Sequence, residues 1–293
     1  MLSERNRGCL VKTRENGTVV CFVTGRKSLR QIGHVADLCD YIVLSNGGTA
    51  LKMPGEELLY TTLVDPADLE KLVDFCNRER IVLHIMDENY WGVNFFTDQV
   101  REQEVRYQNR AVLYRAFQDV PLKAVDGFVA NGDWRVLERF IRAEKLNLCC
   151  VATAKNMVDI MPAGVNKWQG VQRVAEREEI SPHEIIAAGN YYNDLEMIIG
   201  AAVGVAVQNL SLIHIWAPQL RGPFYRYRRK SYLEAGKKGR SVPATALIGM
   251  VCRMTCPGPL TTVLKMPSPP KSIFFTPGTE TISMPQEASI AAR

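Results

Sequence analysis

The stretch IIAAGNYYNDLEMI, residues 185–198, joins a short apolar run to a helical pattern through a polar turn. The apolar run ends at Gly189 and predicts a buried strand. The turn that follows carries Asn190, Asn193 and Asp194, whose side chains all offer oxygen atoms. Ligands of open parallel sheets bind outside the carboxyl ends of the strands, so this turn is a candidate binding site.

Three further segments have the same strand pattern. They are TVVCFVT (18–24), DYIVLSNGG (40–48) and VGVAVQN (203–209). The segment between the first two, GRKSLRQIGHVADLC (25–39), has apolar residues at helical spacing and predicts a helical crossover. Strand, helix and strand with short connections form a βαβ unit, so we expect four strands in one parallel sheet.

The middle of the chain interrupts this sheet. Residues 65–79 and 134–145 predict amphipathic helices, residues 80–88 a strand, and residues 146–162 a hairpin that leads back to the sheet. An insertion of this size between two strands of a parallel sheet predicts a second, α+β domain, which we call the cap.

Polar groups follow three of the predicted strands of the sheet. TGR (24–26) and SNGG (45–48) accompany the turn after Gly189, and Lys167 opens a helix directly after the cap. Hydroxyl and backbone N–H donors with a cation suit a phosphate, and hard oxygen ligands suit Mg²⁺. The pattern therefore indicates phosphoryl-transfer chemistry.

The chain resembles a known family at these positions. FVTGR, a cap, GVNK, IIAAGNYYNDLEMI and VGVAVQN are similar in order and spacing to the haloacid dehalogenase-like (HAD) phosphatases of the Cof-type (HAD-IIB) branch. The resemblance covers about residues 1–209. It implies a Rossmann-like parallel sheet core of the HAD fold with an inserted α+β cap domain. It also implies a Mg²⁺-dependent phosphomonoesterase acting on a small phosphorylated metabolite such as a sugar phosphate.

The resemblance implies roles for individual residues around the phosphate. Thr24 would hold the transferring phosphoryl group and Lys167 would neutralise it. Gly25, Arg26 and Asn46, which follow the ends of the strands, are further candidates for binding the phosphate. Arg26 could instead pair with a carboxylate, and Asn46 could simply be a turn residue before a glycine.

The resemblance also implies a Mg²⁺ site at the turn formed by Asn190, Asn193 and Asp194. The family places an aspartate after the glycine of this turn, whereas this chain has Asn190. A neutral amide oxygen lacks the charge that makes a carboxylate a good ligand, so we expect weak metal binding. The alternative is that Asn190 only satisfies backbone groups of the turn.

The family's first motif, an aspartate pair in a DxDGT turn after the first strand, does not occur in this sequence. The first of these aspartates is the nucleophile of the family, so we expect the chain to be an inactive fragment, or a non-catalytic protein that binds phosphorylated ligands. The missing strand would lie between the strands at 18–24 and 184–190. Its loss would leave both with unpaired backbone groups.

The last part of the chain differs in composition. Residues 1–210 contain 24 Lys and Arg against 28 Asp and Glu, a net of −4, whereas residues 211–293 contain 12 against 3, a net of +9. One codon choice for LSLIHI (210–215) also spells a transposon end used in sequencing libraries. We therefore expect residues 210–293 to be a non-native or disordered tail. If the tail is native, its basic and aromatic run would favour nucleic-acid binding.

The expected domain organisation is core 1–62, cap 63–160, core 161–209 and tail 210–293. The sequence has no apolar stretch of transmembrane length and no signal peptide pattern, so we expect a cytoplasmic protein with no membrane partner. Scattered single cysteines favour reduced thiols. We expect a small phosphorylated metabolite, rather than nucleic acid, as the partner.

Overall fold

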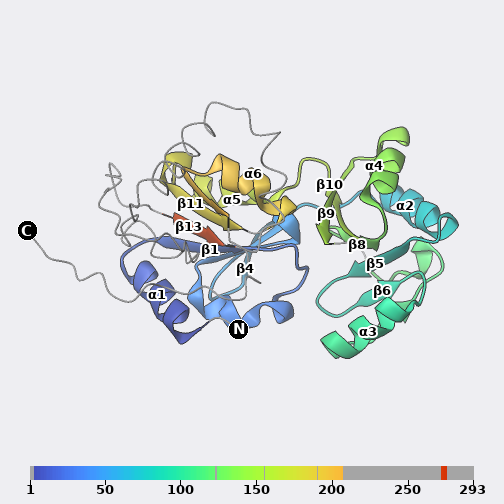
Figure 1. Cartoon of the computed structure of the whole chain (residues 1–293), viewed down its shortest axis with the longest axis horizontal. Helices are drawn as coiled ribbons and strands as arrows, with labels where there is room; N and C mark the ends of the chain where they lie inside the picture. The colour runs from blue at the N-terminus through green and yellow to red at the C-terminus, as the bar shows by residue number, and fades with distance from the viewer. Residues whose placement is uncertain (1–2, 123, 155, 190, 207–271, 276–293) are drawn as a thin grey trace, which may run out of the picture. The chain divides into compact units, whose positions relative to one another are not determined.

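The computed structural model describes residues 3–206 without 123, 155 and 190, together with residues 272–275 (Figure 1). The chain divides into two compact units, which we describe one at a time. Unit 1 comprises Met1–Phe22, Val35–Tyr41 and Val171–Arg293. Unit 2 comprises Val23–His34 and Ile42–Gly170.

Unit 1 contains a parallel sheet. Its strands follow the order β12 (Val203–Ala206), β11 (Ile185–Gly189), β13 (Ser272–Phe275) and β1 (Val19–Val23, whose last residue belongs to unit 2). Each neighbouring pair in this order is parallel. The predicted strands at 18–24, 184–190 and 203–209 are therefore confirmed over their described residues, while 190 and 207–209 lie outside these.

Strand β13 lies between β1 and β11 (Figure 1). Its residue Phe274 is in register with Cys21 of β1 on one side and with Ala187 of β11 on the other. The expectation that β1 and β11 have unpaired backbone groups between them is thus wrong, because a segment of the predicted tail pairs with both. The rest of that tail lies outside the described residues.

Helices of unit 1 are held to the sheet by apolar and polar contacts. Helix α1 (Glu4–Glu15) is tied to β1 through Asp40, which accepts from the Arg14 guanidinium at 2.8 Å and from the Val20 N–H at 2.9 Å. Helix α5 (Lys167–Arg177, of which Lys167–Gly170 belong to unit 2) buries Val171 and Val174, and α6 (Leu195–Gly200) follows β11.

The predicted helical crossover at 25–39 is not an α-helix. It forms two 3₁₀ segments, η1 (Leu29–Gln31) and η2 (Gly33–Leu38), and Ile32 between them is fully buried. Glycine disfavours a continuous α-helix at this point, and short pieces with i→i+3 bonds are the usual alternative.

Unit 2 contains the strands β2 (Tyr41–Leu44, whose first residue belongs to unit 1), β3 (Thr49–Lys52) and β4 (Glu57–Thr61) in that order. Strands β3 and β4 form an antiparallel hairpin that was not predicted from the sequence.

A second sheet in unit 2 has six strands in the order β7-β6-β5-β8-β10-β9. Its elements are α2 (Pro66–Arg78), β5 (Val82–Met86), β6 (Trp91–Val93), α3 (Asp98–Tyr107), β7 (Val112–Leu113), β8 (Phe128–Asn131), α4 (Trp134–Ala143), β9 (Leu148–Ala154) and β10 (Met157–Pro162). The sheet is antiparallel except for the pair β6–β7. The predicted helices α2 and α4, strand β5 and hairpin β9–β10 are confirmed, whereas β6, β7, β8 and α3 were not predicted.

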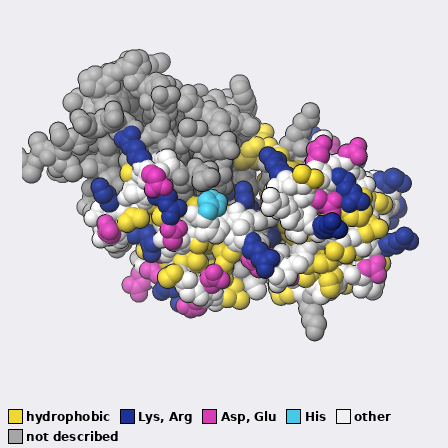
Figure 2. Space-filling model, turned by 90° about the horizontal axis from the view of Figure 1, so that it is seen from below, with side chains coloured by type: hydrophobic (Ala, Val, Ile, Leu, Met, Phe, Trp, Pro, Cys, Tyr) yellow, Lys and Arg dark blue, Asp and Glu magenta, His cyan; other side chains and the backbone are white. Residues whose placement is uncertain are grey.

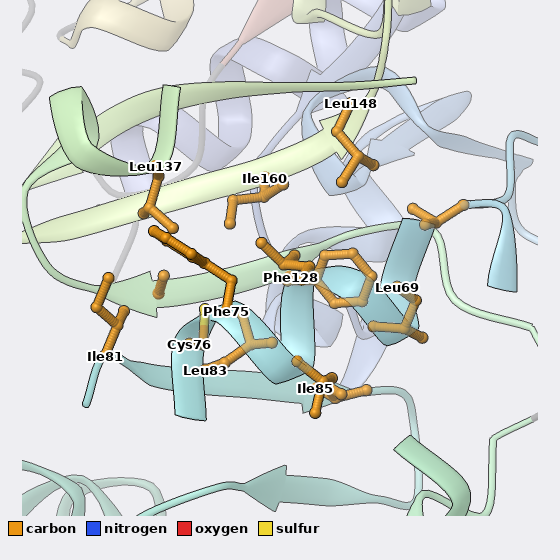
Figure 3. Close-up of a cluster of buried hydrophobic side chains, with 14 of the residues drawn as sticks. Leu69, Phe75, Cys76, Ile81, Leu83, Ile85, Phe128, Leu137, Leu148 and Ile160 are labelled. Carbon is orange, nitrogen blue, oxygen red and sulfur yellow. The ribbon is translucent and has the colours of Figure 1, made fainter. Parts of the chain in front are cut away.

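One face of this second sheet forms a hydrophobic core with α2 and α4 (Figure 3). Phe75 of α2 stacks on Phe140 of α4 with ring centroids 3.8 Å apart. Ile160 of β10 points into this core, and because successive strand residues face opposite sides, Asp159 lies on the other face. The apolar alternation of β10 therefore directs a carboxylate away from the core.

None of the helices in the described part of the chain combines the length and the apolar character needed to cross a membrane.

Candidate active site

The turns that follow β1 and β2 are fastened to each other by backbone hydrogen bonds within unit 2. The Thr24 N–H donates to the carbonyl of Val43 at 2.8 Å, and the Asn46 N–H donates to the carbonyl of Thr24 at 2.9 Å. The Thr24 hydroxyl oxygen accepts from the Arg26 N–H at 3.2 Å. Thr24 is buried, so its hydroxyl has a fixed position at the end of the strand.

Asn46 connects this pair of turns to the second sheet. Its Nδ2 donates to Oδ2 of Asp159 on β10 at 2.6 Å, and both residues are buried. A Cβ at Gly25 would lie 2.7 Å from the same carboxylate oxygen, so a side chain at position 25 would displace Asp159. Gly25 and Asn46, two predicted site residues, are therefore brought together around Asp159.

Lys167 reaches this region because α5 begins beside the turn after β2. The side chain of Asn166 caps the helix by accepting from the Gln169 N–H at 2.8 Å. Gly47 has φ +109°, and a Cβ there would lie 2.2 Å from the Asn166 carbonyl oxygen. Gly170 of α5 is in turn packed against the Gly47 backbone. Two glycines thus allow the close approach that sets the first residue of the helix, Lys167.

The buried carboxyl group of Asp159 is influenced by several neighbouring polar and charged groups. Burial raises the pKa of the Asp159 carboxyl group, while the positive charge of Lys27, the hydrogen bond from Asn46 and the charge of Lys167 act in the lowering direction. Lys167 and Lys27 are themselves buried. Asp159, next to the Thr24 turn, is thus hydrogen-bonded by the Asn46 amide and influenced by the charges of two buried lysines.

Sequence reasoning missed Lys27, Asp126 and Asp159. The Lys27 ammonium lies 3.9 Å from Oδ1 of Asp126, whose other oxygen accepts from the hydroxyls of Ser45 and Thr49. A signal was available: Asp159 interrupts the apolar run VDIM, and Lys27 directly follows the TGR turn.

Arg26 has a different environment from the other predicted phosphate-binding residues. Its side chain is exposed, and its Nη1 donates to the backbone carbonyl of Gln31 at 2.7 Å. The predicted phosphate contact of Arg26 stays a prediction.

The predicted metal-binding turn belongs to unit 1. Asp194 is fully buried and its Oδ2 accepts from the Tyr191 N–H at 3.0 Å. A Cβ at Gly189 would come within 2.3 Å of the Asp194 side chain, so glycine is required for this fold of the turn. Asn193 is half-buried, and Asn190 lies outside the described residues.

The fit of this turn to Mg²⁺ can be judged from its donors. They are hard oxygen atoms, one carboxylate and one amide among the described residues, and hard oxygens are what Mg²⁺ prefers. Within the described ranges, no group of three His, Cys, Asp or Glu side chains could hold a metal ion. The turn is therefore compatible with Mg²⁺ but supplies little negative charge.

Comparison with known proteins gives the same assignment as the motifs. The family model of haloacid dehalogenase-like hydrolases matches residues 1–212. The chain is 27% identical over 237 residues to an HMP-PP phosphatase of Escherichia coli, covering 75% of this chain and 80% of the relative.

Solved structures of the HAD superfamily share the fold. A phosphatase from Bacteroides thetaiotaomicron superposes with a TM-score of 0.64 at 19% identity, covering 72% of this chain and 78% of the other. A sugar phosphatase of HAD subclass IIB gives a TM-score of 0.63 at 16% identity, covering 80% of this chain and 92% of the other. The family resemblance and the α/β fold class are thus confirmed, and the chain belongs to the haloacid dehalogenase-like hydrolases.

Proposed function

We propose that the site around Thr24 and Lys167 binds the phosphate of a small phosphorylated metabolite, such as a sugar phosphate, for Mg²⁺-dependent hydrolysis. The observation that carries this proposal is that α5, whose first residue is Lys167, begins against Gly47 in the turn that is hydrogen-bonded to the Thr24 turn. Relatives named as HMP-PP phosphatase and sugar phosphatase support a phosphoester as the substrate class.

The residues of this chain would act mainly by positioning and by charge. The Lys167 ammonium would offset the charge on the phosphoryl oxygens, and the Thr24 hydroxyl would orient one of them. Because these groups are buried and held by packing, they need little reorganisation during the reaction. The attacking carboxylate of the family belongs to the DxDGT motif, which this sequence lacks, so we infer that the chain as given binds phosphate without turnover.

Mg²⁺ would be held by Asp194 and Asn193, with Asn190 as a further candidate. When bound, the ion supplies positive charge to phosphoryl oxygens. The described part of this turn has a single carboxylate, so we expect weak Mg²⁺ binding. The site would be filled only at high Mg²⁺ concentration.

The second sheet and its helices α2, α3 and α4 would form the cap that selects the substrate, within the predicted boundaries 63–160. Asp159 and Asn46 already connect this sheet to the Thr24 turn inside unit 2. We place the activity in the cytoplasm, where small phosphorylated metabolites are found.

The test is hydrolysis of phosphomonoesters by the chain extended upstream with a DxDGT strand, assayed with and without Mg²⁺. We expect turnover that requires Mg²⁺ and is abolished by Lys167→Met. The exposed Lys71 of α2 provides the matched control, Lys71→Met, which should have no effect.

Absence of turnover with the restored motif, together with retained phosphate binding, would favour the second candidate, a non-catalytic phosphate-ligand binder. The low negative charge of the described part of the Asp194 turn is the observation in its favour.

Nucleic-acid binding would depend on the basic tail, which lies outside the described residues except for 272–275. In Figure 2 the described side chains of both charge signs are interspersed on the visible face.

A further inference from the structure

Lys27 is a buried cation without a hydrogen-bond acceptor. Its side chain is 2% exposed, and its Nζ has no hydrogen-bond partner among the described residues. Burying an ammonium group is unfavourable unless acceptors replace the lost water. The N–H groups of Lys27 therefore have hydrogen-bonding capacity that no acceptor among the described residues fills.

The two carboxylates near Lys27 direct their oxygen atoms to other donors. Asp126 Oδ1 is 3.9 Å from Nζ, beyond hydrogen-bond distance, and Oδ2 of Asp126 is used by Ser45 and Thr49. Asp159 accepts from Asn46 at 2.6 Å through Oδ2 and from Thr153 at 3.2 Å through Oδ1. Both acids offset the charge of Lys27 without satisfying its N–H groups.

Gly127 leaves room for the ammonium group of Lys27, because it has no side chain. Gly127 has φ +151°, and a Cβ there would lie 2.5 Å from Nζ of Lys27 and 2.6 Å from the Ile160 carbonyl oxygen. Any side chain at position 127 would therefore displace the ammonium. Gly127 precedes β8 and Ile160 lies in β10, so Nζ lies against the second sheet, whereas Thr24 stands three residues earlier at the end of β1.

We propose that Lys27 is a specificity-determining residue that binds a second anionic group of the substrate, the inner phosphate of a diphosphate monoester. This inference rests on the proposed function and deepens it. In the proposed site, Thr24 and Lys167 would hold the transferring phosphoryl group, and Lys27, which lies against the second sheet, would face the leaving group. A monophosphate ester has no second phosphate to satisfy this cation, so the site discriminates in favour of diphosphates.

The test is titration calorimetry of the full 293-residue chain with pyrophosphate and with inorganic phosphate, in buffer containing Mg²⁺. We expect the wild type to bind pyrophosphate more tightly than phosphate. Lys27→Met should weaken pyrophosphate binding by about tenfold or more, the usual range for a hydrogen bond to a charged group, with little change for phosphate. Lys27→Arg keeps the charge and should retain most of the preference, and Lys71→Met is the matched control.

An unchanged preference in Lys27→Met, or equal losses for both probes, would overturn the inference. If Lys167→Met abolishes phosphate binding while Lys27→Met alters neither probe, the proposed function stands and only this inference fails. If the wild type binds neither probe, both fail. Should Lys27→Met unfold, a crystal structure of the wild type with pyrophosphate decides: Nζ within hydrogen-bond distance of a phosphate oxygen supports the inference, and pyrophosphate bound away from Lys27 overturns it.

Discussion

Asn46 and Asp159 are 113 residues apart in the chain, and their side chains are joined by a 2.6 Å hydrogen bond in a buried position. Asn46 has φ 54° and ψ 31°, a left-handed conformation that asparagine tolerates better than most residues. The turn after β2 is thereby shaped so that an amide, and not a charged group, meets the carboxylate of β10.

Replacing this amide by a carboxylate should be costly. Asn46→Asp preserves the size of the side chain but places a second acid against buried Asp159, so we expect a loss of about 2–4 kcal/mol in the free energy of unfolding. Urea denaturation at pH 7 measures it. Asn109→Asp, at an exposed position, is the control; equal stabilities of the two variants would contradict the structural role of the pair.

Gly47 should resist substitution for two separate reasons. Its φ of +109° disfavours any side chain, and a Cβ would lie 2.2 Å from the Asn166 carbonyl oxygen. We expect Gly47→Ala to destabilise the chain by about 3 kcal/mol and to weaken phosphate binding, because the start of α5 carries Lys167. Gly55→Ala, where no atom lies within 4 Å, should be nearly neutral by thermal denaturation. Phosphate binding by Gly47→Ala as tight as that of the wild type would count against this account of the site.

His84 should make stability depend on pH. Burial lowers the pKa of its imidazole, and the Trp91 Nε1–H donates at 3.1 Å to Nδ1, which must stay unprotonated to accept. The folded-state pKa is below the unfolded value of about 6.5. The stabilising contribution of neutral His84 is therefore complete above a pH of about 6.5, and it is lost as the pH falls from there through the folded-state pKa.

The measurement for His84 is the difference in unfolding free energy between the wild type and His84→Gln across this pH range. We expect the difference to shrink as the pH falls from about 7.5 to 5.5, by at most about 1.4 kcal/mol per pH unit. His183→Gln changes an exposed histidine and serves as the control. A pH-independent difference for His84→Gln would disprove the prediction.

Strand β13 should stabilise unit 1 through its pairing with β1 and β11. Ile273→Pro removes a backbone donor from a strand that has neighbours on both sides, so we expect a loss of about 3 kcal/mol. Amide hydrogen exchange should become faster around Val20 and Ile186, the register partners of Ile273. Ile273→Val keeps the donor and should behave as the wild type; unaltered exchange in Ile273→Pro would show that β13 is dispensable.

The candidate site was only partly accessible from the sequence. Thr24, Lys167 and Asp194 stand at the ends of strands or the start of a helix, and such positions can be recognised from local patterns. The pairing of Lys27 with Asp126 could not be found in this way, because 99 residues separate them in the chain and their 3.9 Å ion pair depends on how the second sheet meets the turn after β1.

The sequence by itself determined the strands β1, β11 and β12 and the helices α2, α4 and α5, because apolar periodicity and turn residues act over a few neighbouring positions. Only the tertiary structure decided that Asn46 meets Asp159, that Lys27 lies buried beside Gly127, and that Ser272–Phe275 pairs between β1 and β11. These relationships depend on the pairing and packing of segments far apart in the chain, for which a local pattern carries no information.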